Sequence, residues 1–285
     1  MKAFVRFLFV IALFFAAQQI NAQQTNSGHL QPIIHTEDLI NNGNPAQMMP
    51  NGFIRDRCGF VTQMNKAVNA GYDKAAFERM ISEKISQIKA ARLAGRLTTI
   101  NYVIPVIFHV ISDGTAEGTG ANIIASQVYE QIDQLNKDFG NQSGSPFAVA
   151  ANTGLSFCPV LKDPNGVTLA QPGIERINRI SKGWTDPTTF GSSNAQVNAM
   201  ISYIDGTIKP ASIWNPSVYV NIWMYNFSNS GLLGYATFPP AGLADLPAGE
   251  TATTAGVVFL SGAIGSVASP GTAGNYGLGR TVTHE

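Results

Sequence analysis

The residues of this chain with the clearest chemical potential are a histidine and a glutamate at its end, His284 and Glu285. A His-Glu pair is the first half of the pattern His-Glu-x-x-His, in which two histidines four residues apart on a helix bind one zinc ion. The glutamate of that pattern lies beside the open position of the metal. Half of a five-residue pattern also arises by chance. The pair alone favours a disordered C-terminus without function, so the segments before it must decide.

A second candidate site is the segment RDRCGF, residues 55–60, with its cysteine Cys58. A thiolate is a strong zinc ligand. The chain has one other cysteine, Cys158, in an apolar segment. Two cysteines exclude a disulfide-stapled scaffold. Cys58 is therefore a metal ligand, a structural thiol or the partner of Cys158 in a disulfide.

The overall composition excludes one class of partner. Lys+Arg and Asp+Glu are equal at 18 each, so the formal net charge is zero, and no basic run is present. Nucleic-acid binding rests on clustered Lys and Arg, so we expect no nucleic-acid partner. Charged residues make up only 13% of the chain, which suits an extracellular bacterial protein.

The first 22 residues predict export. Lys2 and Arg6 precede an apolar run over residues 7–17, and a small residue follows at Ala22. This order is typical of a secretory signal peptide. A transmembrane anchor needs about 20 apolar residues, more than this run supplies. We expect cleavage after Ala22, no membrane span afterwards, and a bacterial extracellular or cell-surface location.

Helical and strand patterns alternate after a polar leader over residues 23–52. Apolar periodicity predicts helices at about 73–93, with Asp73 as its N-cap, at 122–140, with Asn122 as its N-cap and Gly140 as its end, and at 194–204. Runs rich in β-branched and aromatic residues predict strands at 102–111, 155–163, 174–180, 218–227, 234–239 and 256–264, with a DPNG turn at Asp163–Gly166. His109 alternates into the first strand and is expected to be a hydrogen-bonded core histidine. This mixture predicts an α/β fold around a twisted sheet.

Several blocks of the chain from about Asn101 onward resemble the pappalysin family of metzincin zinc proteases. They are NIWMYNF, GLLGYA, GVVFLSG and GRTVTHE, in this order, preceded by the strand INYVIPVIFHVI and a helix that ends in QLNKDF. The resemblance implies the upper subdomain of a metzincin. Its features would be a twisted, mostly parallel five-stranded sheet, a backing helix and the start of the active-site helix, preceded by a partly helical propeptide.

The resemblance also implies roles for the two terminal residues. His284 would be the first zinc ligand, and Glu285 would be the general base and acid that activates a zinc-bound water for peptide hydrolysis. The other ligands would follow residue 285, so we expect this chain to be an incomplete and inactive part of a zinc endopeptidase precursor. Its partners would be protein or peptide substrates. The family also allows calcium, for which the sequence presents no site.

Two further sites follow from the resemblance. Relatives hold their precursors latent through a propeptide cysteine, which would make Cys58 a zinc ligand of the zymogen, anchored by Arg55 or Arg57. The edge strand of the upper sheet pairs with extended substrates in metzincins. Its expected members here are Gly231, Leu232, Leu233, Gly234, Tyr235 and Ala236. An ordinary strand that closes the sheet is an equal alternative.

The expected organisation is a signal peptide over residues 1–22, a propeptide over 23–98 and a catalytic part over 99–285. An exposed basic linker around Arg92 and Arg96 is the expected cleavage region. The alternative function is a secreted binding or adhesion protein that keeps a protease-like sheet without catalysis. The sequence predicts no oligomeric state.

Overall fold

The structure, a computed structural model, describes residues 58–59, 63, 69, 73–95, 101–236 and 251–285. The expected signal peptide, the polar leader, Arg55, Arg57 and Arg96 lie outside these residues. None of the helices in the described part of the chain has the length and apolar sequence that a bilayer crossing requires.

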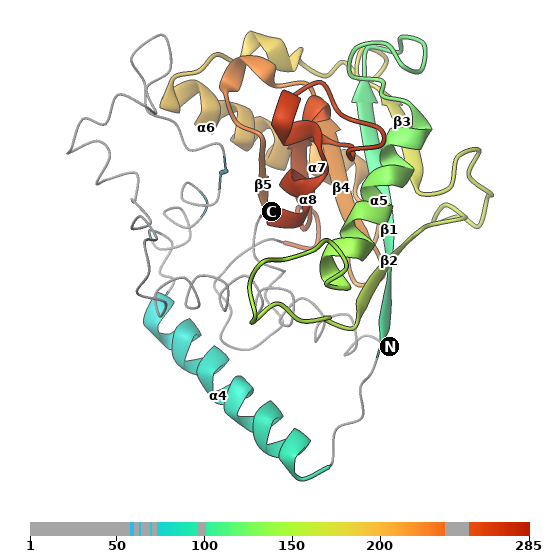
Figure 1. Ribbon diagram of the computed structural model, residues 1–285. Helices are drawn as coiled ribbons and strands as arrows, with labels where there is room; N and C mark the ends of the chain where they lie inside the picture. The colour runs from blue at the N-terminus through green and yellow to red at the C-terminus, as the bar shows by residue number, and fades with distance from the viewer. Residues whose placement is uncertain (1–57, 60–62, 64–68, 70–72, 96–100, 237–250) are drawn as a thin grey trace.

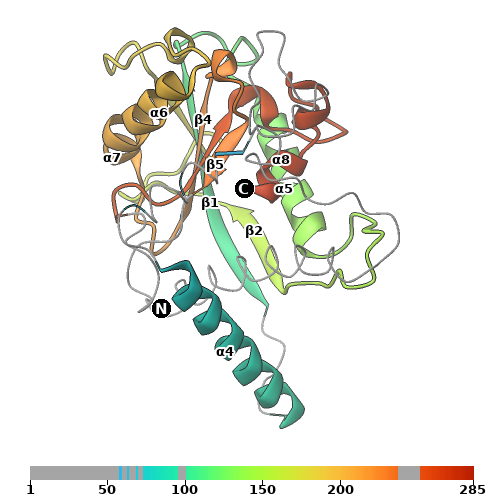
Figure 2. The ribbon, with the colours of Figure 1, turned by 90° about the vertical axis from the view of Figure 1, so that its left-hand side faces the viewer.

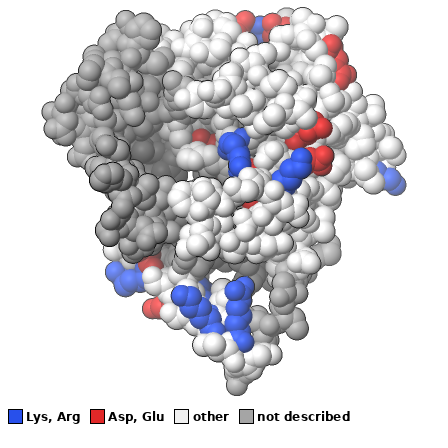
Figure 3. All heavy atoms as spheres, viewed as in Figure 1, with Lys and Arg blue, Asp and Glu red and all other residues white. Residues whose placement is uncertain are grey.

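Helix α4 (Lys74–Leu93) stands beside the body of the protein as a separate rod (Figures 1 and 2). Its predicted N-cap is confirmed, because the carboxylate of Asp73 accepts a hydrogen bond from the backbone N–H of Ala76 at 2.9 Å. Phe77 and Ile81 are its buried residues. Basic side chains, drawn in blue, gather over α4 in the lower part of Figure 3. The rest of that face is mostly uncharged, with scattered basic and acidic side chains. Arg92, in the expected cleavage region, is exposed in the last turn.

Among the described residues, six strands form one sheet. They are β1 (Tyr102–Ser112), β2 (Leu155–Pro159), β3 (Ile174–Asn178), β4 (Val220–Tyr225), β5 (Gly234–Ala236) and β6 (Val257–Leu260). Their order is β2-β1-β4-β6-β5, with β3 also paired to β1, and every pair is parallel except β5 with β6. β2 pairs with residues 102–106 of β1 and β3 with residues 108–112. Both therefore share one edge of β1, and the sheet is five strands wide, as expected.

Helices cover both faces of the sheet, which makes a three-layer α/β fold (Figure 2). One face carries α5 (Ala125–Phe139) and α8 (Arg280–His284). The other carries α6 (Asn194–Tyr203), a π-helical turn (Ile204–Ile208) and α7 (Lys209–Ser212). Short 3₁₀ turns occupy Pro187–Thr189, Ser228–Ser230, Ser261–Ala263 and Gly274–Gly277.

The alternation of side chains along the strands builds both cores. In β4, Met224 packs on the α5 face with Val128, whereas its neighbours Trp223 and Tyr225 pack on the α6 face with Met200. All five of these side chains are at most 1% exposed. The strands β1, β4 and β6 are nearly continuous apolar runs because both faces of this sheet are covered.

The start of α5 differs from its prediction. Ile124 occupies the N-cap position and makes no side-chain capping bond, and the carboxylate of Glu117 accepts from the N–H of Ala125 at 2.6 Å. Asn122 instead donates to the backbone oxygen of Thr115 at 2.6 Å and accepts from Arg176, so its amide closes the loop before the helix. The predicted end is confirmed, since Gly140 is the C-cap and its N–H bonds the carbonyl of Asn136.

The turn at Asp163–Gly166 is present and local. The carboxylate of Asp163 accepts hydrogen bonds from the backbone of Asn165 and Val167, and a bridge between Lys162 and Thr168 closes the loop. The turn does not join β2 and β3 as a hairpin, because both strands run parallel to β1.

His109 is a core histidine, as predicted. It is fully buried in β1, its Nδ1 lies 2.6 Å from the carboxylate of Glu175, and its Nε2 lies 2.9 Å from Oδ1 of Asn221. Its ring stacks on Trp223 at 5.2 Å. Both ring nitrogens therefore have partners within the sheet, so His109 ties β1 to β3 and β4.

Candidate metal centre

The short helix α8 brings the two C-terminal residues to the sheet. It begins at Gly279, whose φ of +93° is a left-handed conformation that favours glycine. A Cβ there would lie 2.7 Å from both Cγ of Gln134 and the carbonyl oxygen of Gly265. Past this tight start, the backbone N–H of Glu285 bonds the carbonyl of Thr281 at 3.2 Å. The prediction that His284 lies in a helical turn is confirmed.

Three potential ligands meet at the end of α8. Cys58, His284 and Glu285 each offer one ligand atom, and these atoms lie within 4.8 Å of one another. The thiol of Cys58 donates a hydrogen bond to Oε2 of Glu285 at 3.2 Å. No disulfide joins Cys58 and Cys158, so the disulfide alternative is wrong. In the described part of the chain, this is the one such group of three or more His, Cys, Asp or Glu side chains.

Cys58 reaches this position because its segment adds to the free edge of β5. Cys58 forms a parallel bridge with Gly234, and the N–H of Gly59 donates to the carbonyl of Gly234 at 2.9 Å. A Cβ on Gly59 would lie 2.6 Å from Cβ of Tyr235. Glycine is therefore required for this close approach, and the pairing places Cys58 close to His284, as expected of a zinc ligand of the zymogen.

The carboxylate of Glu285 lies in a desolvated position. Burial raises its pKa to about 7, while hydrogen bonds from the Cys58 thiol and the backbone of Ala236 act in the opposite direction. A carboxyl group with such a pKa can both accept and return a proton near neutral pH. The pKa of Glu285 thus lies near neutral pH, and the backbone of Ala236 connects this carboxylate to β5.

The donor set of this cluster fits a zinc ion. Imidazole nitrogen and thiolate sulfur are the ligands that zinc prefers in proteins. His284 and Cys58 would hold the ion, and the remaining carboxylate of Glu285 would lie beside it. His284 is exposed and the other two residues are half-buried, so one side of the cluster faces solvent.

The six residues expected to form the edge strand divide into two parts. Gly234, Tyr235 and Ala236 form β5 at the edge of the sheet, antiparallel to β6. Gly231 ends a 3₁₀ turn at φ +75°, Leu232 is buried in the core, and Leu233 accepts a backbone hydrogen bond from Leu260. The strand is shorter than predicted, and residues 237–239 lie outside the described ones.

A buried charged cluster supports β5 from behind. The hydroxyl of Tyr235 donates to Oδ1 of Asp205 at 2.9 Å, and Nζ of Lys209 lies 2.9 Å from the same oxygen. Lys209 is fully buried, with its ammonium 5.0 Å from the ring centre of Tyr235 and 5.4 Å from that of Trp223. The π-helical turn before Lys209 places Asp205 in this cluster.

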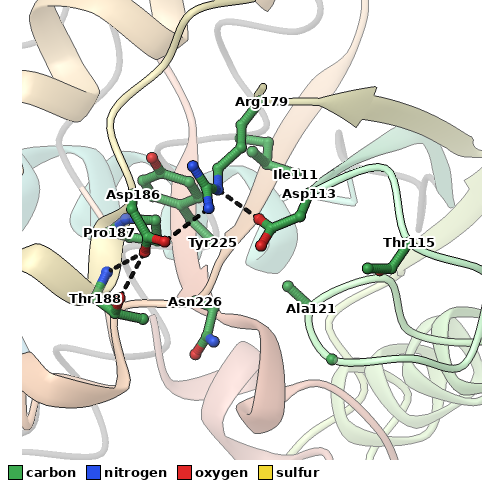
Figure 4. A pocket seen from close by; sticks show the side chains of 11 residues that line it. Ile111, Asp113, Thr115, Ala121, Arg179, Asp186, Pro187, Thr188, Tyr225 and Asn226 are labelled. Carbon is green, nitrogen blue, oxygen red and sulfur yellow. Dashed lines mark hydrogen bonds and ion pairs between the residues drawn. The ribbon is translucent and has the colours of Figure 1, made fainter. Parts of the chain in front are cut away.

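A separate cavity lies where β1, β3 and β4 end, and it shares no residue with the Cys58 cluster (Figure 4). Arg179 stands between two carboxylates there, 2.5 Å from Asp113 and 2.7 Å from Asp186. The hydroxyl and backbone N–H of Thr188 bond Asp186 and lower its pKa. These charges satisfy one another and stabilise the loops after the strands.

Sequence reasoning missed Asp138 and Lys209, two buried charged residues that support the site. Asp138 lies in the last turn of α5, where a negative charge opposes the helix dipole. That unfavourable position was a readable indication of a partner elsewhere in the fold. Lys209 carried no comparable indication of burial. Its carboxylate partner Asp205 lies four residues earlier in the π-helical turn, but the rings of Trp223 and Tyr235 that lie against its ammonium come from β4 and β5.

Comparison with known proteins agrees with this architecture. No protein-family model matches the chain, and no curated protein matches it significantly. Among solved structures, it is similar to a Glu-to-Ala mutant of promirolysin from Tannerella forsythia, with a TM-score of 0.51 and 28% identity over 80% of this chain and 66% of that one. It also matches mature mirolysin from the same organism in complex with a cleaved peptide, with a TM-score of 0.45, at 30% identity over 65% of this chain and 61% of that one.

The chain thus spans less than two thirds of the length of these proteins. The similarity to promirolysin shows that its mixed α/β fold, with a mostly parallel sheet, is a metzincin-type metalloprotease fold.

Proposed function

We propose that this chain belongs to the precursor of a secreted zinc endopeptidase of the pappalysin type, and that Cys58 keeps its metal site latent. One observation carries the proposal. The Cys58 segment pairs with the edge strand β5 and places its thiol 3.2 Å from Glu285, within the same cluster as His284. A propeptide that blocks both the metal position and the edge strand is a sufficient basis for latency.

The donor atoms of the three residues indicate a different role for each. His284 is a metal ligand, and Cys58 is a ligand only in the precursor. A zinc ion in this position would polarise the scissile carbonyl and acidify water. Glu285 accepts a proton from the attacking water and returns it to the leaving amine, a role that its raised pKa supports.

The edge of β5 is the proposed substrate-binding surface. An extended peptide can add to an exposed sheet edge through backbone hydrogen bonds. Gly59 makes such a bond to Gly234, so the precursor segment occupies the edge that a substrate would use. The similarity to a mirolysin structure that contains a cleaved peptide agrees with peptides as substrates but carries no part of the argument.

Cobalt substitution tests the metal site in the chain itself. Cobalt(II) bound by a thiolate has an intense ultraviolet charge-transfer absorption. We expect this band in the chain and in Cys158→Ser, the matched control, and its loss in Cys58→Ser. His284→Ala should lose cobalt binding. A band that survives Cys58→Ser and disappears in Cys158→Ser would contradict the latency role.

Activity of the intact, processed protein tests the role of Glu285. Glu285→Gln should keep the metal and lower kcat by about 10²–10⁴-fold, because it removes the proton acceptor without removing a ligand. Cys58→Ser in the precursor should speed activation. Unchanged peptide hydrolysis in Glu285→Gln would contradict the mechanism, and absence of hydrolysis in the processed protein would favour a non-catalytic binding protein.

Export and processing are tested at the N-terminus. The signal-like residues 1–22 support secretion, so exported precursor should begin at Gln23. Processed protein should begin after residue 92 or 96, in the basic segment between α4 and β1. Processed protein that still begins at Gln23 would show that the segment after the signal peptide is not a removable propeptide.

A further inference from the structure

A single carboxylate joins the helix α5 to the helix that carries His284. Asp138, in the last turn of α5, accepts from Nη1 of Arg280 at 2.6 Å and from the hydroxyl of Thr283 at 2.5 Å. Gln134 in α5 and Ser143 in the loop after α5 donate hydrogen bonds to the same carboxylate. Figure 1 shows α5 and α8 next to each other on one face of the sheet.

The position of Asp138 is unfavourable for α5. Its side chain is only 3% exposed, and burial of a carboxylate costs free energy unless hydrogen bonds replace its water. The C-terminal turn of a helix also repels negative charge. Arg280 supplies the opposite charge from α8, although its own side chain is 59% exposed. The contacts of Asp138 therefore stabilise the junction between the helices rather than α5 itself.

Because of the geometry of α8, the contacts of Asp138 set the direction in which the side chains of His284 and Glu285 point. Arg280 and Thr283 are three residues apart and share one face of the helix. Bonds to two points on one face fix the rotation of a helix about its axis. His284 and Glu285 directly follow Thr283, so that rotation sets where both side chains point.

A second residue of α5 fixes the beginning of α8 in the same way. Gln131 is fully buried; its amide nitrogen donates to the carbonyl of Gly279 at 3.0 Å and its oxygen accepts from the N–H of Gly265 at 3.1 Å. Gln131 and Asp138 are seven residues apart, two turns along one face of α5. The start and the end of α8 are thus bonded to the same stripe of one helix.

We propose that Asp138 is a positioning residue for the metal centre, which acts through Thr283 and Arg280 to direct His284 and Glu285 toward Cys58. This inference rests on the proposed function, since it assumes that His284 binds zinc. Loss of the hydrogen bonds that orient metal-ligating residues commonly changes metal affinity by about 10–100-fold.

Zinc affinity of the full chain, measured by competition with a chromophoric chelator, tests the proposal. Asp138→Asn should raise the dissociation constant for zinc by about 10–100-fold. The amide of Asn has no negative charge, and it lacks the second oxygen that lets the carboxylate accept from both Arg280 and Thr283. Asp133→Asn, an exposed carboxylate on the same helix, is the matched control and should bind like the parent. The cobalt spectrum should change its shape in Asp138→Asn, because the ligand geometry changes.

Substitutions at Thr283 give an independent test that does not depend on the folding of Asp138→Asn. Thr283→Val removes only the hydroxyl and should weaken zinc binding, whereas Thr283→Ser keeps the hydroxyl and should restore it. Unfolding midpoints with chelator present measure the purely structural effect of each change.

The outcomes separate the inference from the function on which it rests. If His284→Ala abolishes zinc binding but Asp138→Asn and Thr283→Val bind as tightly as the parent, the positioning role is wrong and the metal site stands. If His284→Ala binds zinc like the parent, the proposed function is wrong, and the inference falls with it.

Discussion

The Cys58 cluster lies between β5 and α8, and each of these elements contacts a buried charged side chain. The two buried charges differ in how far their ion-pair partners are exposed to solvent. Behind β5, Lys209 is fully buried and its partner Asp205 is 22% exposed. Beside α8, Asp138 is 3% exposed but its partner Arg280 is 59% exposed. Salt screens a pair that reaches solvent far more than a buried one. The ion pair behind β5 is thus part of the folded core, whereas the ion pair beside α8 reaches solvent and is weakened by salt.

Removal of the buried lysine should have the largest effect on stability. Lys209→Met leaves the carboxylate of Asp205 without its cation and should lower the free energy of unfolding by about 3 kcal/mol. Urea unfolding measures this, with Lys182→Met, an exposed lysine, as the control. Equal stability of the two variants would show that the cluster behind β5 contributes nothing to the fold.

The start of α8 should be the next most sensitive point. Gly279→Ala adds a Cβ at a positive φ and within 2.7 Å of two atoms, so we expect a loss of about 2 kcal/mol. Gly166→Ala has a similar positive φ, +86°, with no atom within 4 Å of the added Cβ. The difference between the variants isolates the steric part. If Gly166→Ala costs as much, close packing at Gly279 does not hold α8.

Removal of one hydroxyl tests how much of the β5 support passes through Tyr235. Tyr235→Phe removes the bond to Asp205 and leaves the ring in place, so the free energy of unfolding should fall by about 1 kcal/mol. Tyr219→Phe, whose ring packs edge-on against Trp214, is the control. If Tyr235→Phe costs as much as Lys209→Met, the two changes disrupt one cooperative unit and not two contacts.

The fold was predictable from sequence because its elements have strong local patterns. The run Tyr102–Ile111 had the density of β-branched and aromatic residues of a buried strand, and the helix at 73–93 carried a clear cap and periodicity. The proximity of Cys58, His284 and Glu285 was expected from the resemblance alone, because no periodicity relates residues 227 positions apart. Asn122 was misread because its amide had tertiary partners that outweighed its capping preference. The burial of Lys209 was not predicted, because the rings of Trp223 and Tyr235 that lie against its ammonium come from distant strands.

The smallest expected effect on global stability, and the most informative for latency, comes from Gly59. In Gly59→Ala the new Cβ would lie 2.6 Å from Cβ of Tyr235, so the Cys58 segment cannot keep its pairing with β5. The thiol itself is unchanged. Segments that open locally do so with little effect on the rest of a fold, so the unfolding midpoint should not move.

The rate at which Cys58 reacts with a thiol reagent measures this opening, in a Cys158→Ser background that leaves one thiol. A local cost of about 1.4 kcal/mol would raise the open population, and thus the rate, about tenfold. Gly206→Ala is the matched control, because a Cβ there has no atom within 4 Å. If Gly59→Ala reacts no faster than this control, the pairing with β5 does not hold Cys58 at Glu285. The thiol would then be held by its contacts with the cluster itself, and the edge of β5 would be open to peptides even in the precursor.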